Sequence, residues 1–236
     1  MSHIMFGDDV KTHTQSPTCM GASVIGLCFT DGVVIAADNL ASWGRMARFP
    51  GCSRLLKVND KTIAGSSGDY ADFQYLTSLI ERKQIEEETH EDGFELSARS
   101  LHSWLTRVQY NRRNKMDPLW TSWAVGGIDS EGPYLGFVNK LGAAFKDKLI
   151  GIGFGSQFAM PLLRKYHEEK KGQITRVEAI EFVKKCMSTI FLRDCSAHPE
   201  FEIAVVDSTG SEILGPLRVN TDWSLAAKTR GMLFAQ

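Results

Sequence analysis

The sequence is short of the features that mark several classes of protein by composition. Its five cysteines are odd in number and scattered, with no C-x-x-C pair, so a disulfide framework or zinc ribbon is not expected. No run approaches the roughly 18 apolar residues of a transmembrane helix, and residues 1–13 lack the apolar core of a secretory signal. With a net charge of −1, the chain shows no sign of a nucleic-acid or membrane-binding surface.

Cofactor and metal motifs are also missing. The six histidines show no ligand spacing, so no metal site is predicted. The glycine-rich stretch 151–155 superficially suggests a phosphate loop, but it lacks the Lys-Ser/Thr pair of a P-loop and is better explained as a strand-to-helix turn. We therefore expect no cofactor, and an unrelated α/β enzyme is a weak alternative.

What the chain does have is 236 residues with 43% apolar side chains, enough for a sizeable core. Period-2 and apolar runs predict strands at 24–29, 33–37, 54–58, 62–64, 121–128, 134–139, 142–146, 201–207 and 212–215. Helical spacing predicts helices over 69–90, 96–115 and 156–169. A fourth helix opens with the Thr175/Glu178 capping box, and its apolar stripe runs through Val177, Ile180, Val183, Met187 and Ile190. Strand groups separated by helix pairs predict an α+β protein with a four-layer αββα sandwich.

The first predicted hairpin ends on a carboxylate, Asp38, and begins just after Gly21 and Ala22. By itself this run is most simply a core strand. Together with other stretches, at 14–17, 47–49, 68–76, 102–107, 112–120 and 212–217, it resembles the proteasome beta subunits over almost the whole chain. The resemblance is strongest to the beta type-4 class, which fills the seventh beta position of the eukaryotic 20S core particle. It implies the sandwich of the N-terminal-nucleophile hydrolases.

The resemblance also assigns catalytic positions. Active members carry a threonine nucleophile with a free amine, a lysine, an aspartate that orients the lysine, an oxyanion glycine, and a serine–aspartate–serine set nearby. In this chain these positions hold Ala22, Arg54, Asp38, Gly68, Phe154, Asp194 and Ala197. Alanine has no hydroxyl, and an arginine pKa above about 12 makes a poor proton shuttle. An Asp38–Arg54 pair is expected to hold the two hairpins together.

The resemblance therefore implies a non-catalytic structural beta subunit, with no catalytic residue of its own. The alternative is an active threonine-type endopeptidase subunit, for which position 22 offers no nucleophile. Ser23 is a weak substitute, because neighbouring side chains on a strand point to opposite faces. A free-standing binding module of the same fold is a further alternative.

Domain organisation and partners follow from the same resemblance. Residues 1–13 would be a propeptide or a disordered arm, with His13 and Thr14 flanking the candidate processing site. One domain is expected over 14–216, and a tail over 217–236, with Trp223, Leu225 and Phe234, would contact another subunit. Arg112, Arg113 and Lys115 are either a subunit contact or simply the charged end of a helix. The implied partners are beta subunits of the same and the opposite ring and alpha-ring subunits, in the cytoplasm and nucleus.

Overall fold

The computed structural model describes residues 16–90, 93, 95–221 and 224. Within these residues the strands form two sheets in which all pairs are antiparallel. The larger sheet has eight strands: β1 (Cys19–Gly21), β4 (Leu40–Trp43), β5 (Met46–Pro50), β6 (Leu55–Asn59), β7 (Thr62–Asp69), β8 (Thr121–Asp129), β9 (Gly132–Val138) and β10 (Ala144–Lys146). The smaller has five: β2 (Val24–Phe29), β3 (Gly32–Asp38), β11 (Leu149–Ile152), β12 (Glu200–Asp207) and β13 (Gly210–Arg218).

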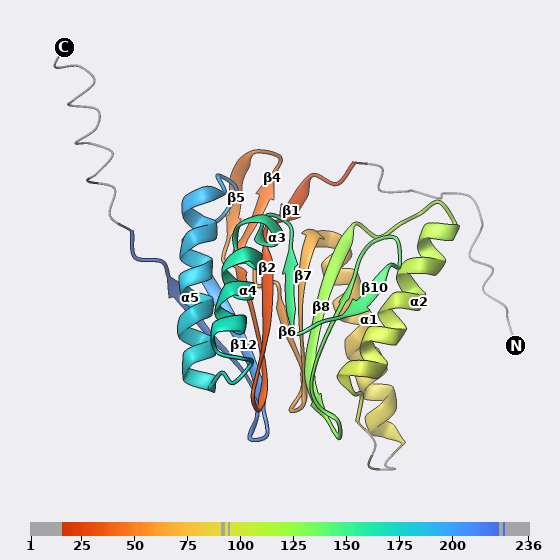
Figure 1. Ribbon diagram of the computed structural model, residues 1–236. Coiled ribbons are helices and arrows are strands. Elements are labelled where there is room, and N and C mark those ends of the chain that lie inside the picture. The colour runs from red at the N-terminus through yellow and green to blue at the C-terminus, as the bar shows by residue number, and fades with distance from the viewer. Residues whose placement is uncertain (1–15, 91–92, 94, 222–223, 225–236) are drawn as a thin grey trace, which may run out of the picture.

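The helices cover the two outer faces of the sheets. They are α1 (Tyr70–Thr89), α2 (Ala98–Asn114), α3 (Gly155–Phe158), α4 (Met160–Glu169) and α5 (Arg176–Arg193). Figure 1 shows α1 and α2 on one side and α4 and α5 on the other, with the two sheets between them. This confirms the predicted αββα sandwich. No helix in the described part of the chain is both long and apolar enough to span a membrane.

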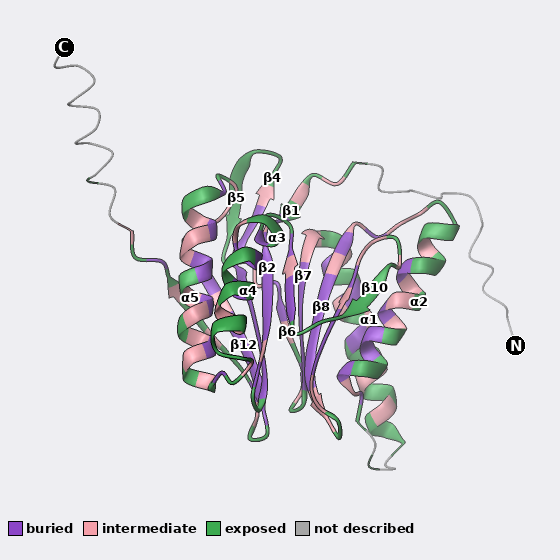
Figure 2. Cartoon of the chain, viewed as in Figure 1, coloured by how far each residue is buried: buried purple, intermediate pink, exposed green. Residues whose placement is uncertain are grey.

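Three apolar clusters join the four layers. One packs α4 and α5 on the five-stranded sheet and includes Val183 and Ile190. A second packs α1 and α2 on the eight-stranded sheet around Trp123. The third fills the space between the sheets, where Val33, Ile35 and Ile63 are fully buried. Figure 2 shows the buried residues concentrated along these central strands, among them β2, β3 and β7.

Strand order places the first strand of the described chain inside the larger sheet. That sheet runs β10-β9-β8-β7-β1-β4-β5, with β6 also pairing with β7. Met20 and Gly21 of β1 lie opposite Asp69 and Gly68 of β7, and Gly21 also lies opposite Ala41 of β4. The chain passes directly from β1 through Ala22 into β2, and thus from one sheet to the other.

The structure corrects the helix predictions in two places. The helix predicted over 156–169 is divided into α3 and α4 at Ala159, and Pro161, which has no N–H to donate, lies in the first turn of α4. Val177 is 71% exposed rather than part of the buried stripe. At 100° per residue it lies about 200° around α5 from the buried Ala179.

Strand prediction missed four short elements, β1, β4, β5 and β11. The predicted domain boundary at 216 falls within β13, and the Val219 amide beyond it donates to the Pro199 carbonyl at 2.8 Å. The tail residues Trp223, Leu225 and Phe234, like His13 and Thr14, lie outside the described residues.

Candidate functional site

The site is built around Ala22, at the junction of β1 and β2. Its side chain is a methyl group and its amide is part of a continuous chain. Its carbonyl accepts hydrogen bonds from Arg54 Nη1 at 3.2 Å and from the Ser67 hydroxyl. Nothing at position 22 can act as a nucleophile or a free amine.

Arg54 lies beneath this junction and is bonded on every side. Its Nη2 forms an ion pair with Asp38 Oδ1, and both side chains are only 2% exposed. Its remaining N–H groups donate to carbonyl oxygens of Asp38, Ala22, Ser66 and Ser23 at 3.0–3.2 Å. We call Arg54 and these partners the Arg54 cradle. The expected Asp38–Arg54 pair is present in the structure.

The charged groups of the Arg54 cradle are held by hydrogen bonds and by each other. Asp38 Oδ2 also accepts from the His198 amide at 3.0 Å, which uses both carboxylate oxygens. Burial raises the pKa of the Asp38 carboxyl, although the Arg54 guanidinium and the His198 amide oppose that rise. Because a guanidinium stays protonated in proteins, Arg54 can hold charge in place but cannot pass a proton on.

Two glycines let the backbone approach this closely. A Cβ on Gly21 would lie 2.2 Å from Arg54 Cδ. Gly68 has φ +110°, and a Cβ there would lie 2.1 Å from the Trp120 carbonyl oxygen. Gly68 is thus required by the backbone itself, and it lies opposite Gly21, as the resemblance implies for a residue beside position 22.

Ser23 faces away from position 22. Its side chain is buried, and its hydroxyl accepts a hydrogen bond from the Gly155 amide at 2.9 Å. The hydroxyl therefore ties β2 to the start of α3. This bond accounts for the serine without any role as a nucleophile.

Phe154 and Ser196 line another part of the site, and Asp194 and Ala197 lie within two residues of Ser196. We call these four residues the Phe154 rim. Phe154 is 49% exposed, with its ring 5.9 Å from that of Phe158. Asp194 follows α5, and its Oδ1 accepts from the Ser196 amide at 2.9 Å and the Ser196 hydroxyl at 2.6 Å. Its buried Oδ2 has no hydrogen-bond partner among the described residues.

The Phe154 rim also departs from the pattern that the resemblance implies. The resemblance places serines at the positions of Phe154 and Ala197, and this chain has a hydroxyl at neither. Ala197 instead packs against the apolar cluster beneath α5. A buried carboxylate oxygen without a donor is costly, so the Phe154 rim is less well satisfied than the Arg54 cradle.

A surface hollow of about 310 Å³ separates the cradle from the rim. Its lining includes Ala22 and Phe154 together with three hydroxyl side chains that sequence reasoning did not single out, Ser42, Ser67 and Ser196. Ser67 directly precedes Gly68 and Ser196 follows Asp194 by two residues, and this adjacency is the only sequence signal for them. The hollow offers hydroxyls and backbone groups but no paired base for acyl transfer.

Other predicted residues lie away from the site. Arg112 and Arg113 occupy the last turn of α2, and Lys115 caps it. Arg112 Nη2 lies 2.6 Å from Asp117 Oδ2, and Arg113 Nη1 donates to Asn114 Oδ1 at 3.1 Å. Among the described residues, no group of three or more His, Cys, Asp or Glu side chains is placed to hold a metal ion.

Comparison with known proteins agrees with this architecture. The sequence model of the family described as "Proteasome subunit" matches residues 19–206. A Xenopus laevis protein named proteasome subunit beta type-4 is 45% identical, over 95% of this chain and 92% of its own length. The Drosophila melanogaster protein of the same name is 38% identical, over 93% and 82%. A Saccharomyces cerevisiae protein named proteasome subunit beta type-7 is 34% identical, over 95% and 88%.

Proposed function

The chain belongs to the proteasome beta-subunit family, and on that premise we propose that it is a non-catalytic, structural subunit of the 20S core particle. The observation that carries the proposal is the methyl group at position 22, where active members of the family have a hydroxyl. The relatives named beta type-4 cover nearly the whole chain, which supports the same place in the particle.

The geometry around position 22 supports inactivity independently of the missing hydroxyl. Met20 and Gly21 are paired on both sides, with β4 and β7, and Cys19 is paired with β4, so the amide of Ala22 lies within an ordered chain. The charged group beneath it is a guanidinium held by carbonyls and Asp38, rather than an amine able to exchange a proton. Restoring a hydroxyl alone would thus supply one of several missing parts.

In this function the chain works by its shape. It completes a seven-membered beta ring, contacts beta subunits of its own and the opposite ring, and rests on an alpha ring. A closed ring of different subunits requires two distinct contact faces on each member. The five cysteines are free thiols, as expected for a protein of the reducing cytoplasm and nucleus.

The test is purification through an affinity tag on this chain, followed by native sizing and mass spectrometry of its companions. We expect co-migration with other proteasome subunits rather than a free species of 26.3 kDa.

The same particle is then treated with a peptide epoxyketone that reacts with N-terminal threonines. Companion subunits should be labelled and this chain should not. A covalent adduct on this chain, or its recovery as a free monomer, would overturn the proposal.

A further inference from the structure

The β4–β5 hairpin, residues 40–50, exposes an unusual amount of apolar surface. Trp43 is 53% exposed, Met46 58% and Phe49 40%, and all five residues of β5 are exposed. Figure 2 shows this hairpin as exposed along β5, at the end of the sandwich. We call Trp43, Arg45, Met46, Arg48 and Phe49 the hairpin surface. The site at position 22 uses none of these side chains.

Neither face of β5 is covered. It is the last strand of the eight-stranded sheet, and its sole pairing in the described chain is with β4. The opposite edge strand, β10, is also exposed, but its Phe145 ring lies 4.8 Å from that of Phe137. On β5 the Phe49 ring lies beside a charged group, the Arg48 guanidinium, whose Cζ is 5.7 Å from the ring centroid. Apolar side chains gathered in this way on a soluble chain mark an interaction surface.

The backbone edge of β5 is poorly suited to pairing with another strand. Arg48 is the extra residue of a bulge, because Ala41 and Ser42 pair with Phe49 and Ala47. Pro50, which cannot donate a ladder hydrogen bond, closes the strand. Bulges and prolines are the usual protections against pairing with another strand. A partner therefore docks on the side chains of the hairpin surface rather than extending the sheet.

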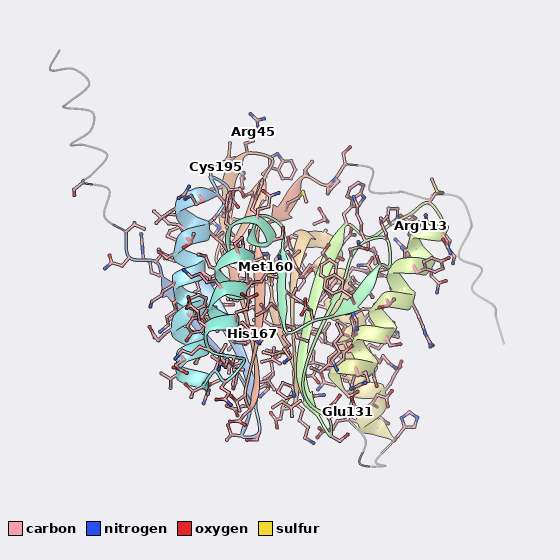
Figure 3. The ribbon with its side chains drawn as sticks, in the orientation of Figure 1. Arg45, Arg113, Glu131, Met160, His167 and Cys195 are labelled. Atoms are coloured by element: carbon pink, nitrogen blue, oxygen red, sulfur yellow. The ribbon has the colours of Figure 1, made fainter. Side chains whose placement is uncertain are left out.

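The charge of the hairpin surface is of one sign. Between Asp38 and Asp60 the sequence has no acidic residue, whereas Arg45 and Arg48 carry positive charge on the hairpin itself. Both arginines are exposed, and Figure 3 shows Arg45 projecting from the tip of the hairpin away from the body of the protein. The complementary partner surface carries carboxylates around an apolar centre.

We propose that the hairpin surface docks on an acidic, apolar-centred face of another beta-type subunit of the same particle. This inference rests on the proposed function, which supplies a protein neighbour for the exposed side chains. Two cations are too few to hold a nucleic acid at physiological salt, whereas three large apolar side chains with an arginine rim are typical of the centre and rim of a protein interface. Trp43 and Met46 form its centre, since they lie opposite each other in the β4–β5 register.

The first experiment maps the neighbour in the assembled particle. The photoreactive residue p-benzoylphenylalanine replaces Met46 in the full chain, the particle is purified, and irradiated samples are analysed by mass spectrometry. An adduct to a segment of another beta-type subunit that contains Asp or Glu is expected. An adduct to an alpha-type subunit, lipid or nucleic acid, or no adduct in an intact particle, would overturn the inference.

The second experiment tests the chemistry. Arg45→Glu/Arg48→Glu should lower incorporation of this chain into the particle at least about tenfold against wild type, because like charges would face each other. The matched variant Arg45→Lys/Arg48→Lys keeps both charges and should incorporate normally. Equal incorporation of both variants would contradict the acidic partner. The wild-type chain separates failure of this inference from failure of the proposed function. If the wild-type chain is absent from the particle, the proposed function is wrong. If the wild-type chain is present but the crosslinking and charge-reversal results are negative, only the docking face is wrong.

Discussion

The two sides of the site at position 22 differ in how fully their buried polar groups are hydrogen-bonded. In the Arg54 cradle every partner is satisfied: Asp38 uses both oxygens, and the guanidinium donates to four carbonyls. In the Phe154 rim, Asp194 has a buried oxygen without a donor, and a half-exposed phenylalanine stands beside the hollow. The two aspartates of the site therefore differ: both carboxylate oxygens of Asp38 are hydrogen-bonded, whereas only one oxygen of Asp194 is.

The largest expected effect tests the cradle. Asp38→Asn removes the charge opposite a buried guanidinium, and breaking a buried pair in this way typically costs about 3–5 kcal/mol. We expect a loss of unfolding free energy in that range, measured by urea denaturation monitored by circular dichroism. Asp60→Asn, at an exposed partner of Lys57, serves as the control and should cost under about 1 kcal/mol. Similar losses in the two variants would show that the cradle contributes no special stability.

The next effect tests how closely β1 rests on the cradle. Gly21→Ala places a methyl group where Arg54 Cδ already lies, and Arg54 is fixed by its hydrogen bonds. Overpacking of this kind costs about 1–3 kcal/mol, and we expect the upper part of that range in thermal and urea unfolding. Met20→Ala, at an exposed neighbour, should stay within about 0.5 kcal/mol. A neutral Gly21→Ala would mean that β1 can move off Arg54.

The same Asp-to-Asn change in the Phe154 rim should cost less stability than in the Arg54 cradle. Asp194→Asn keeps an oxygen that accepts from Ser196 and removes a charge that has no countercharge bonded to it within the described part of the chain. We expect the unfolding free energy to change by no more than about 1 kcal/mol. A loss as large as that of Asp38→Asn would erase the difference between the two sides and would indicate an unseen donor at Oδ2.

The smallest expected effect concerns an exposed charged pair, Lys170 and Glu178, for comparison with the buried Asp38–Arg54 pair. Lys170 and the Thr175 amide and hydroxyl lower the pKa of Glu178, at the start of α5, to about 2. A carboxylate with a lowered pKa stabilises the fold above its ordinary pKa, 4.5, and loses that contribution as the pH falls toward 2. The stability difference between wild type and Glu178→Gln should thus be constant from pH 7 to about 5 and vanish by about pH 2. A difference that grows on acidification would contradict this assignment.

Features encoded locally were predictable from sequence, and features that depend on distant partners were not. The Thr175/Glu178 capping box needs only neighbouring residues and is present as predicted. The four-layer arrangement could be predicted from the sequence because the central strands and the helix faces have clear apolar periodicity. The β4–β5 hairpin was missed because its exposed strand has no buried face to impose alternation.

The site shows the same division. The resemblance identified Asp38 and Arg54 as a pair, and the structure has that pair. Ser67 and Ser196 could not be found from pattern, since they reach the hollow from segments well over 100 residues apart. The unpaired oxygen of Asp194 could not be predicted either, because it depends on which donors the fold brings near the carboxylate.

The position of β1 has a consequence for maturation. In the described sheet, β1 is the strand that joins β4 and β5 to the remaining five strands: Cys19, Met20 and Gly21 pair with β4, and Met20 and Gly21 pair with β7. Exposing the amine of residue 22, as an active enzyme of this family requires, means cutting off those three residues. The cut would leave the β4–β5 hairpin without a hydrogen-bonded neighbour and open a gap one strand wide in the larger sheet. The residues directly ahead of position 22 are therefore an integral part of the larger sheet in this structure.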